Sequence, residues 1–409
     1  MWNTVPGPSR VKGIEVPATN MSRYVLLWFL GLYLRLGILI VPPLIPRLES
    51  ILGFSSSQSA VLTSLPMLLI GVGALIGGWF IARLGVVGTL VLGLGVMAAG
   101  SALRGITAGF SLFVFATVVM GLGVAFMQTG LPALTRSWLP DNVGRAAAVY
   151  TNGLLTGELL AAGLTGSLVT FVLGDAWLLA FVVWVLPVPV LMAVVWWRAV
   201  IARPVAPAPA SSVPLSPDWR DPLLWRVAVV LAGAGTLYFC GNIFLPPILA
   251  ASDRLYLLDA SLAALNGIQI LSSGLLIAYA DRLLHRRWPL YAATVIALLL
   301  IPALLWLPGT GVIWAAGLFG AVTSALLILG LALPAWLVPA EEVSRMAAGV
   351  LFIGYTLVFV VPTVGGWLTD VTGSLALGFL PVVLFGVAVL AAIGGIRQRG
   401  PAANHVAGT

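Results

Sequence analysis

Two charged residues lie deep inside apolar stretches of this sequence. Arg35 is near the middle of 28–46 (WFLGLYLRLGILIVPPLIP), and Glu158 lies within the apolar stretch 145–170. A guanidinium keeps its charge at any relevant pH, and charge in hydrocarbon is costly, so Arg35 must face a protein interior or an aqueous cavity. Its five donors in a fixed fork can bind an anionic or strongly polar group. We therefore predict that Arg35 binds the substrate; the alternative is a permanent ion pair that holds helices together.

Glu158 is the predicted partner of Arg35. If their helices begin at 24 and 145, the two residues lie at similar depth. At 1.5 Å per residue both are roughly 17–20 Å from the same side of the molecule. A buried carboxylate tends toward protonation unless a cation faces it. Glu158 could therefore neutralise Arg35 in the empty state and take up a proton when an anion displaces it. A static salt bridge is the alternative.

Further polar side chains mark candidate faces of a central cavity. Asn266, Gln269 and Ser273 recur at i, i+3 and i+7, which is one stripe of a helix. Thr151 is seven residues before Glu158 and shares its face. The remaining predicted substrate-binding residues are Gln128, Tyr150, Tyr238, Asn242 and Tyr355. For each of these groups the alternative is a hydrogen bond between neighbouring helices.

The composition places these residues in a membrane. The 409 residues are 60% hydrophobic and only 8% charged, whereas soluble domains carry roughly 25% charged residues. Repeated apolar stretches of about 20 residues predict transmembrane helices. A single cysteine, Cys240, excludes an intramolecular disulfide, and two histidines argue against a metal site. The sequence has no P-loop and no Ser/His/Asp grouping, so we expect neither an enzyme nor a bound cofactor.

Twelve spans with both termini in the cytoplasm are predicted, which makes the fold an all-α membrane protein. With the N-terminus inside, sixteen of the 20 Lys and Arg residues fall in inside segments, and Arg47, Arg104 and Arg254 fall outside. This asymmetry follows the positive-inside rule of a cell (inner) membrane protein. It also explains the net charge of +7 without nucleic acid. The predicted spans are 24–46, 59–82, 86–103, 110–135, 145–170, 177–197, 223–248, 260–280, 289–307, 311–337, 345–369 and 374–396.

An internal repeat divides the spans into two sets of six. Val41-Pro42-Pro43-Leu44 recurs as Leu245-Pro246-Pro247-Ile248, and Leu131-Pro132-Ala133 recurs as Leu333-Pro334-Ala335. Because each set holds an even number of helices, both halves have the same orientation, as in a rocking transporter. The predicted domains are a cytoplasmic tail (1–23), a six-helix bundle (24–197), a Pro/Ala/Ser-rich cytoplasmic linker (198–222), a second bundle (223–396) and a cytoplasmic tail (397–409).

The segment after the second span resembles the signature of the major facilitator superfamily, Gly-x-Leu-Ala-Asp-Arg-x-Gly. Residues 78–85 read GWFIARLG, which keeps the glycines and Arg83 but lacks the aspartate. The second half has Asp281 and Arg282 at the corresponding place. The resemblance implies the two-bundle fold and a cytoplasmic gate that includes Arg83, Asp281 and Arg282.

Within that superfamily the first half is similar to the cyanate permease and 2-nitroimidazole transporter family. Tyr33-Leu34-Arg35-Leu36 stands where that family has Asn-Leu-Arg-Pro, and it is followed by Pro42–Pro46 and by Leu52-Gly53-Phe54-Ser55. We therefore expect a secondary transporter, functional as a monomer, that moves a small anionic or polar solute (cyanate-, nitro- or carboxylate-like) together with a proton. The alternatives are a proton-coupled exporter of drug-like compounds and, from another class, a membrane-embedded enzyme or receptor.

Overall fold

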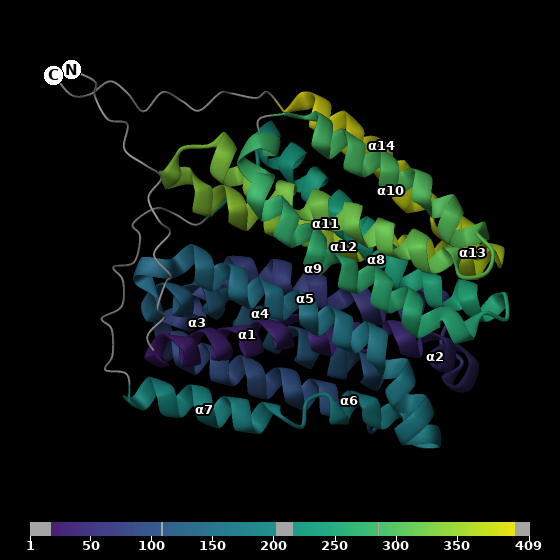
Figure 1. Cartoon of the computed structure of the whole chain (residues 1–409), viewed down its shortest axis with the longest axis horizontal. Coiled ribbons are helices and arrows are strands. Elements are labelled where there is room, and N and C mark those ends of the chain that lie inside the picture. The colour runs from purple at the N-terminus through teal and green to yellow at the C-terminus, as the bar shows by residue number, and fades with distance from the viewer. Residues whose placement is uncertain (1–17, 108, 202–215, 285, 397–409) are drawn as a thin grey trace, which may run out of the picture.

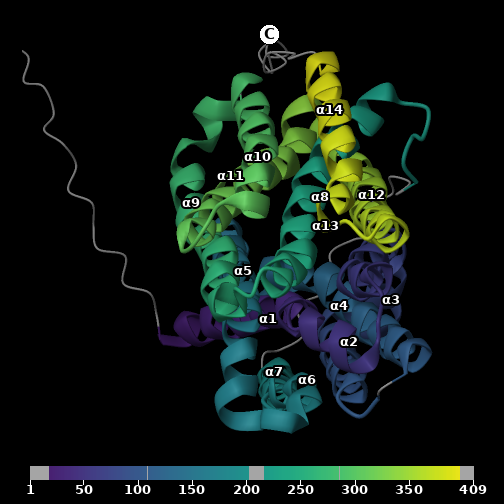
Figure 2. The same cartoon turned by 90° about the vertical axis from the view of Figure 1, so that its right-hand side faces the viewer.

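The computed structural model describes residues 18–107, 109–201, 216–284 and 286–396, and their regular structure is helical. Figure 1 shows the helices in two groups, with α1–α7 in the lower part and α8–α14 in the upper part. The described chain begins and ends at one end of the bundle, which we call the terminal end. The opposite end, where α2 and α13 lie, is called the far end (Figures 1 and 2).

Each group of helices comes from one half of the chain. The first half comprises α1 (Ala18–Leu39), α2 (Ile45–Leu52), α3 (Ser56–Arg104), α4 (Phe110–Trp138), α5 (Val143–Leu168), α6 (Ala180–Val183) and α7 (Val188–Ile201). The second half comprises α8 (Pro222–Ala251), α9 (Leu258–Leu284), α10 (Trp288–Trp306), α11 (Gly311–Leu337), α12 (Ala340–Thr372), α13 (Leu375–Gly378) and α14 (Leu380–Gly395).

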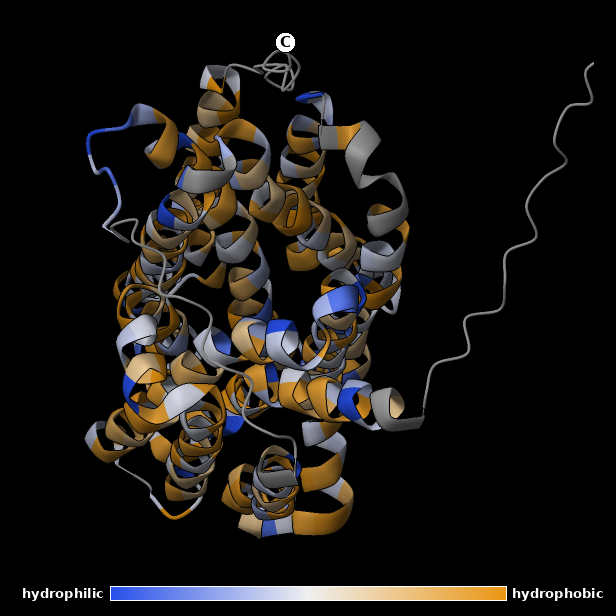
Figure 3. Cartoon of the chain, turned by 90° about the vertical axis from the view of Figure 1, so that its left-hand side faces the viewer, coloured by the Kyte–Doolittle hydropathy of each residue, from blue (hydrophilic) through white to orange (hydrophobic). Residues whose placement is uncertain are grey.

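The helices have the length and surface of membrane spans. Within the described residues, 10 helical stretches are long and apolar enough to cross a membrane. Two of these, Ser56–Arg104 and Pro140–Ala199, hold 49 and 60 residues, at least twice the roughly 20 that one crossing needs. Most residues of the helices are hydrophobic (Figure 3). The chain is therefore a multi-pass membrane protein.

The first predicted span is not one continuous helix. α1 ends at Leu39, and a 3-10 turn at Pro42–Leu44 leads into α2. The break follows from Pro42 and Pro43, because proline has no N–H to continue the helical hydrogen bonds. Between the second and third predicted spans, the helical geometry of α3 is interrupted at Gly85, with φ 71° and ψ 168°. Glycine adopts this positive φ without steric cost.

The two halves meet most extensively between α3 and α12 and between α5 and α9, and α8 also contacts α2 and α3 (Figure 2). At the α3–α12 contact, at the far end, the Asp370 carboxylate accepts hydrogen bonds from the backbone N–H of Ser56 (2.8 Å) and of Ser57 (3.0 Å). These N–H groups begin α3 and have no partner within their own helix. At the α5–α9 contact, also at the far end, the hydroxyl of Ser167 donates to Asp259. An acidic side chain of the second half therefore binds a helix end of the first half at both contacts.

Candidate functional site

Close packing of α1 against α5 positions the two deep charges. A Cβ on Gly153 would collide with the carbonyl oxygen of Trp28, and one on Gly157 would collide with that of Leu32. Small residues let membrane helices approach until their backbones touch. Glu158, directly after Gly157, is therefore held against the turn of α1 that carries Arg35.

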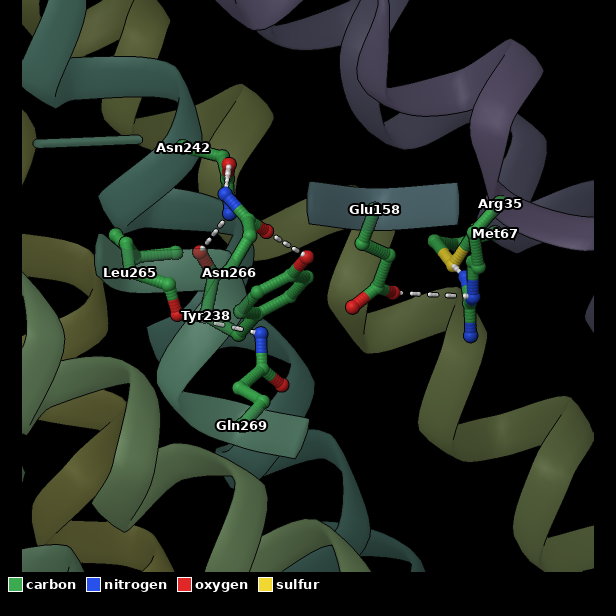
Figure 4. A network of polar contacts seen from close by, with 8 residues as sticks. All are labelled: Arg35, Met67, Glu158, Tyr238, Asn242, Leu265, Asn266 and Gln269. Atoms are coloured by element: carbon green, nitrogen blue, oxygen red, sulfur yellow. Dashed lines mark hydrogen bonds and ion pairs between the residues drawn. The ribbon is translucent and has the colours of Figure 1, made fainter. Parts of the chain in front are cut away.

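Arg35 and Glu158 form an ion pair in the protein interior. The distance from Arg35 Nε to Glu158 Oε1 is 3.5 Å, and the two residues are 7% and 4% exposed (Figure 4). Arg35 also donates from a terminal nitrogen to the Met67 sulfur at 2.7 Å. Arg35 Nε and Glu158 Oε2 have no hydrogen-bond partner among the described residues. A thioether is a weak acceptor, so both charged groups keep binding capacity for another molecule.

The second half of the chain supplies a polar network on the other side of Glu158. The hydroxyl of Tyr238, on α8, donates to the side-chain oxygen of Asn266, on α9. Asn266 Nδ2 donates to Asn242 Oδ1 at 3.1 Å, and Asn242 Nδ2 donates to the Tyr238 carbonyl at 3.1 Å. Figure 4 shows Glu158 between the Tyr238 ring and Arg35. The two amides therefore bind each other and their helices, and they fix the Tyr238 hydroxyl close to Glu158.

Gln269 and Tyr355 complete the cluster. Gln269 is 3% exposed and donates a long hydrogen bond, 3.4 Å, to the Leu265 carbonyl. Tyr355, on α12, is 8% exposed and lies beside the Arg35 guanidinium. The cluster therefore combines one cation and one acid from the first half with phenols and an amide from the second half.

Two of the predicted binding residues lie apart from this cluster. Tyr150 and Thr151 are seven or eight residues before Glu158, which is about 10–12 Å along α5 toward the terminal end. Thr151 is exposed, whereas Tyr150 is half-buried. Gln128, on α4, is half-buried, and its Oε1 has no hydrogen-bond partner among the described residues.

The predicted cytoplasmic gate can be followed only at Arg83. This side chain is exposed, and its guanidinium stacks on the ring of Trp79 in its own helix, 4.2 Å from the ring centre. Asp281 and Arg282 are part of α9, but their side chains lie outside the described residues. The gate stays a prediction.

Two contacts around Arg35 were not predicted: one to its side chain and one to the backbone of α1 two residues later. Met67 contacts Arg35 directly, and a methionine in an apolar helix gives no sequence signal for such a contact. Arg104 was counted among the outside charges, in the loop after the third predicted span; the structure makes it the last residue of α3, 0% exposed. Its guanidinium binds the Gly37 carbonyl at 2.7 Å. Gly37 and Arg104 are far apart in the sequence, and only the tertiary structure brings them together.

A separate groove of about 430 Å³ opens between α3 and α12 near the far end. Its lining is mostly apolar, and the Arg35 cluster is not part of it. The groove is lined by Ser57, Gln58, Val61, Phe110, Thr363, Val364 and Trp367. Among the described residues, no group of three or more His, Cys, Asp and Glu side chains could hold a metal ion. The Arg35 cluster therefore remains the candidate site.

Sequence comparison identifies the family. The profile of the Major Facilitator Superfamily matches residues 27–319, which is more than half of the chain. The chain belongs to the Major Facilitator Superfamily. This confirms the resemblance that the residues 78–85 predicted, and it makes the protein a membrane transporter rather than an enzyme.

Members of this superfamily with curated descriptions match almost the whole chain. The cyanate transport protein CynX of Escherichia coli (strain K12) is 26% identical over 355 residues, covering 86% of this chain and 90% of CynX. The 2-nitroimidazole transporter of the same strain is also 26% identical over 355 residues, covering 85% of this chain and 87% of that protein. The uncharacterized transporter YycB of Bacillus subtilis (strain 168) is 26% identical over 385 residues, covering 90% and 91%.

Solved structures of the superfamily share the fold. The crystal structure of a D-xylose–proton symporter superposes with a TM-score of 0.70 at 14% identity, covering 94% of this chain and 99% of the symporter. A bacterial homolog of the human lysosomal transporter Spinster, in an inward-facing and unoccupied conformation, gives a TM-score of 0.69 at 15% identity and covers 93% and 96%. At these identities the likeness extends to the fold alone.

Proposed function

We propose that this protein is a secondary active transporter that moves a small anionic or polar solute across the cell membrane by alternating access, with Arg35 as its substrate anchor. The observation that carries the proposal is the state of the Arg35 side chain. It is buried, its Nε lacks a hydrogen bond, and a terminal nitrogen donates to the Met67 thioether, which is a weak acceptor. A guanidinium nitrogen in this state gains more from a charged or strongly polar acceptor than from a thioether.

The chemistry of the cluster favours a compact, delocalised solute. Arg35 offers a planar fork of donors, and Tyr238, Tyr355 and Gln269 offer polar groups from the other half. A cyanate, nitro or carboxylate group has two or more acceptor sites close together and fits such a fork. The names of the relatives support this class, since one is described as a cyanate transport protein and another as a 2-nitroimidazole transporter.

Glu158 is proposed to couple transport to a proton. In the empty site it is the counter-ion of Arg35, 3.5 Å away. An anion that binds Arg35 replaces Glu158 as its partner, and the buried carboxylate then loses the charge that favours its ionised form. Uptake of a proton by Glu158 at that step keeps the site neutral. Glu158 also lies between Arg35 and Tyr238, so a change in its charge reaches both halves of the protein (Figure 4).

Alternating access requires two bundles that rock about the site. We propose the bundles 24–197 and 223–396, twelve crossings in all, and termini in the cytoplasm. The two longest stretches, Ser56–Arg104 and Pro140–Ala199, are each long enough for two crossings, which brings the 10 stretches to twelve. The contacts of Asp370 and Asp259 hold the halves together at the far end. In this topology the far end is the outside, and the structure is the state closed to the outside.

The proposal is tested with purified protein in proteoliposomes, using radiolabelled cyanate and 2-nitroimidazole and an imposed pH gradient. Arg35→Met should abolish uptake of the transported probe while the protein still folds. Arg345→Met is the matched control, because this arginine pairs with Glu342 at the surface at 3.9 Å. Glu158→Gln should remove the dependence on the pH gradient but leave exchange of substrate for substrate. Uptake by Arg35→Met at the wild-type rate would overturn the binding role.

A further inference from the structure

The most unusual charge outside the candidate site is Arg104. It is the last residue of α3 and is 0% exposed. One terminal nitrogen donates to the Gly37 carbonyl at 2.7 Å and to the Ser101 hydroxyl at 3.2 Å. The guanidinium carbon lies 4.7 Å from the centre of the Phe181 ring. Its remaining nitrogens have no hydrogen-bond partner among the described residues.

No carboxylate accounts for this buried cation. Among the described residues, the only ion pairs are Arg35 with Glu158 and Arg345 with Glu342. A buried charge without a partner is strongly destabilising, so the protein must supply negative potential in another form. The carbonyl that Arg104 contacts belongs to the end of α1. The C-terminal carbonyls of a helix carry the negative end of its dipole and stabilise a nearby cation.

The sequence of α1 explains why this carbonyl is free. In a continuous helix the Gly37 carbonyl would accept from the N–H of Val41. Pro42 and Pro43 end the helix, and the N–H of Val41 turns instead to the Ile38 carbonyl at 3.5 Å. The Gly37 carbonyl is therefore left inside the protein without a helical partner, where an unpaired polar group is costly. Arg104 provides the missing donor.

We infer that Arg104 is a positioning residue for substrate binding: it caps the last turn of α1 and thereby holds Arg35 in place. The inference rests on the proposed function, in which Arg35 binds the substrate. Arg35 and Gly37 are two residues apart, roughly 200° around α1, so the Arg35 side chain leaves the helix on nearly the opposite side from Gly37. Arg104 therefore acts through the backbone of α1 and not by touching the solute.

The same guanidinium links this turn to a second element. Ser101, which accepts from Arg104, donates to the Phe181 carbonyl in α6 at 2.8 Å. The Phe181 ring packs over the guanidinium. Arg104 thus joins the end of α1 to α3 and to α6. When it is removed, the turn that carries Arg35 loses a fixed support, although the glycine contacts between α1 and α5 remain.

The first test measures binding of 2-nitroimidazole and of cyanate to detergent-purified protein. Arg104→Met should weaken binding of the recognised probe by about tenfold, the lower range for groups that support a binding residue. Arg104→Lys keeps the charge and an N–H donor group and should recover part of the loss. Thr117→Val is the control, because Thr117 is equally buried but bonds only its own helix, at the Phe113 carbonyl. It should bind the probe like the wild type.

The second test needs no substrate. The coupling between Arg35 and Glu158 is measured by a double-mutant cycle. It is the difference between the Tm change of the double variant and the sum of the Tm changes of Arg35→Met and Glu158→Gln. If Arg104 positions Arg35, this coupling should shrink in the Arg104→Met background and be restored only in part by Arg104→Lys. In the Thr117→Val background it should equal the wild-type value. If Arg104→Met does not fold, the comparison is made with Arg104→Lys, in which the coupling should lie below the wild-type value.

The outcomes separate the two ideas. If the wild type binds neither probe, the proposed substrate class fails, and the Arg35–Glu158 coupling still decides whether Arg104 positions Arg35. If the wild type binds a probe and Arg104→Met has unchanged affinity and unchanged coupling, the inference is overturned. A lower Tm for Arg104→Met with full coupling would show that Arg104 only stabilises the fold, which also overturns it.

Discussion

Removing the Asp370 side chain should open the far end of the protein. The two carboxylate oxygens of Asp370 accept from the first free N–H groups of α3, at 2.8 and 3.0 Å, and in this way tie α12 to α3. Asp370→Ala removes both hydrogen bonds and the charge that faces the positive end of the helix. Asp370→Asn keeps one oxygen acceptor but loses the charge, so its effect should be smaller.

The size of the effect follows from the contacts. A hydrogen bond to a charged group contributes about 1.5–3 kcal/mol when it is well shielded from water. Asp370 is exposed, and loss of a cap at an accessible helix start costs ~1 kcal/mol. We therefore expect Asp370→Ala to destabilise the closed far end by about 1–2 kcal/mol, which is a factor of about 5–30 in the ratio of closed to open molecules.

Distances between spin labels at the far end measure this ratio. Ile106 in the first half and Tyr256 in the second are 76% and 75% exposed, so both accept a labelled cysteine. The native Cys240 is 1% exposed and does not compete for label. Asp370→Ala should add a population at longer distance, and Asp370→Ala with Asp259→Ala should enlarge it. Asp175→Ala, an exposed acid of the first half, is the control. Identical distance distributions for Asp370→Ala and Asp175→Ala would refute the reasoning.

Three further substitutions test the site. Gly157→Ala pushes α1 away from α5, so it should cost about 1–3 kcal/mol of stability and abolish uptake; thermal unfolding and uptake assays check both, and wild-type uptake would show that the close contact is dispensable. Tyr238→Phe leaves the buried oxygen of Asn266 without its donor and should lower the free energy of unfolding by about 1–3 kcal/mol; an unchanged stability would argue against the network. Met67→Leu conserves volume, so stability should change by less than about 1.5 kcal/mol. The bound solute should replace the Met67 sulfur as the partner of Arg35, so probe affinity should persist. A large loss of affinity would instead make the thioether part of the binding site.

The proximity of Arg35 and Glu158 followed from the sequence because helical geometry fixes depth. A constant rise per residue converts a position within an apolar span into a depth in the membrane, and few residues of this chain are charged. The glycines that allow the contact, Gly153 and Gly157, are also in the sequence. Their close approach to α1 was not predicted, because small residues indicate that a helix packs tightly but do not identify the partner.

The roles of the amides in the second half could not be read from their spacing. Asn266 and Gln269 lie on one stripe of α9, as predicted, and both are buried. The structure shows that the hydrogen bonds of Asn266 go to Tyr238, Asn242 and its own helix. Gln269 donates a long bond to the Leu265 carbonyl and lies beside the Tyr238 hydroxyl. Sequence spacing gives a face of a helix, whereas the choice between a neighbouring helix and a solute depends on the tertiary structure.

Counting charges assigns Arg104 to a side of the membrane but does not predict what surrounds its side chain. Its position at the end of a predicted span placed it in an outside loop. The structure instead buries it against the Gly37 carbonyl, which the two prolines after α1 have left free. The signal was present as a proline pair that must end a helix inside the protein. Its partner, however, is 67 residues away in the chain, and nothing local connects them.

The central claim is that Arg35 binds the solute, and equilibrium binding tests it most directly. Affinities of 2-nitroimidazole and cyanate are measured for the wild type, Arg35→Met, Arg35→Lys and Arg345→Met in detergent. We expect the wild type and Arg345→Met to bind the same probe equally well. Arg35→Lys should bind it more weakly, because it has the charge without the planar fork, and Arg35→Met should show no binding. Wild-type affinity in a folded Arg35→Met protein would contradict the account.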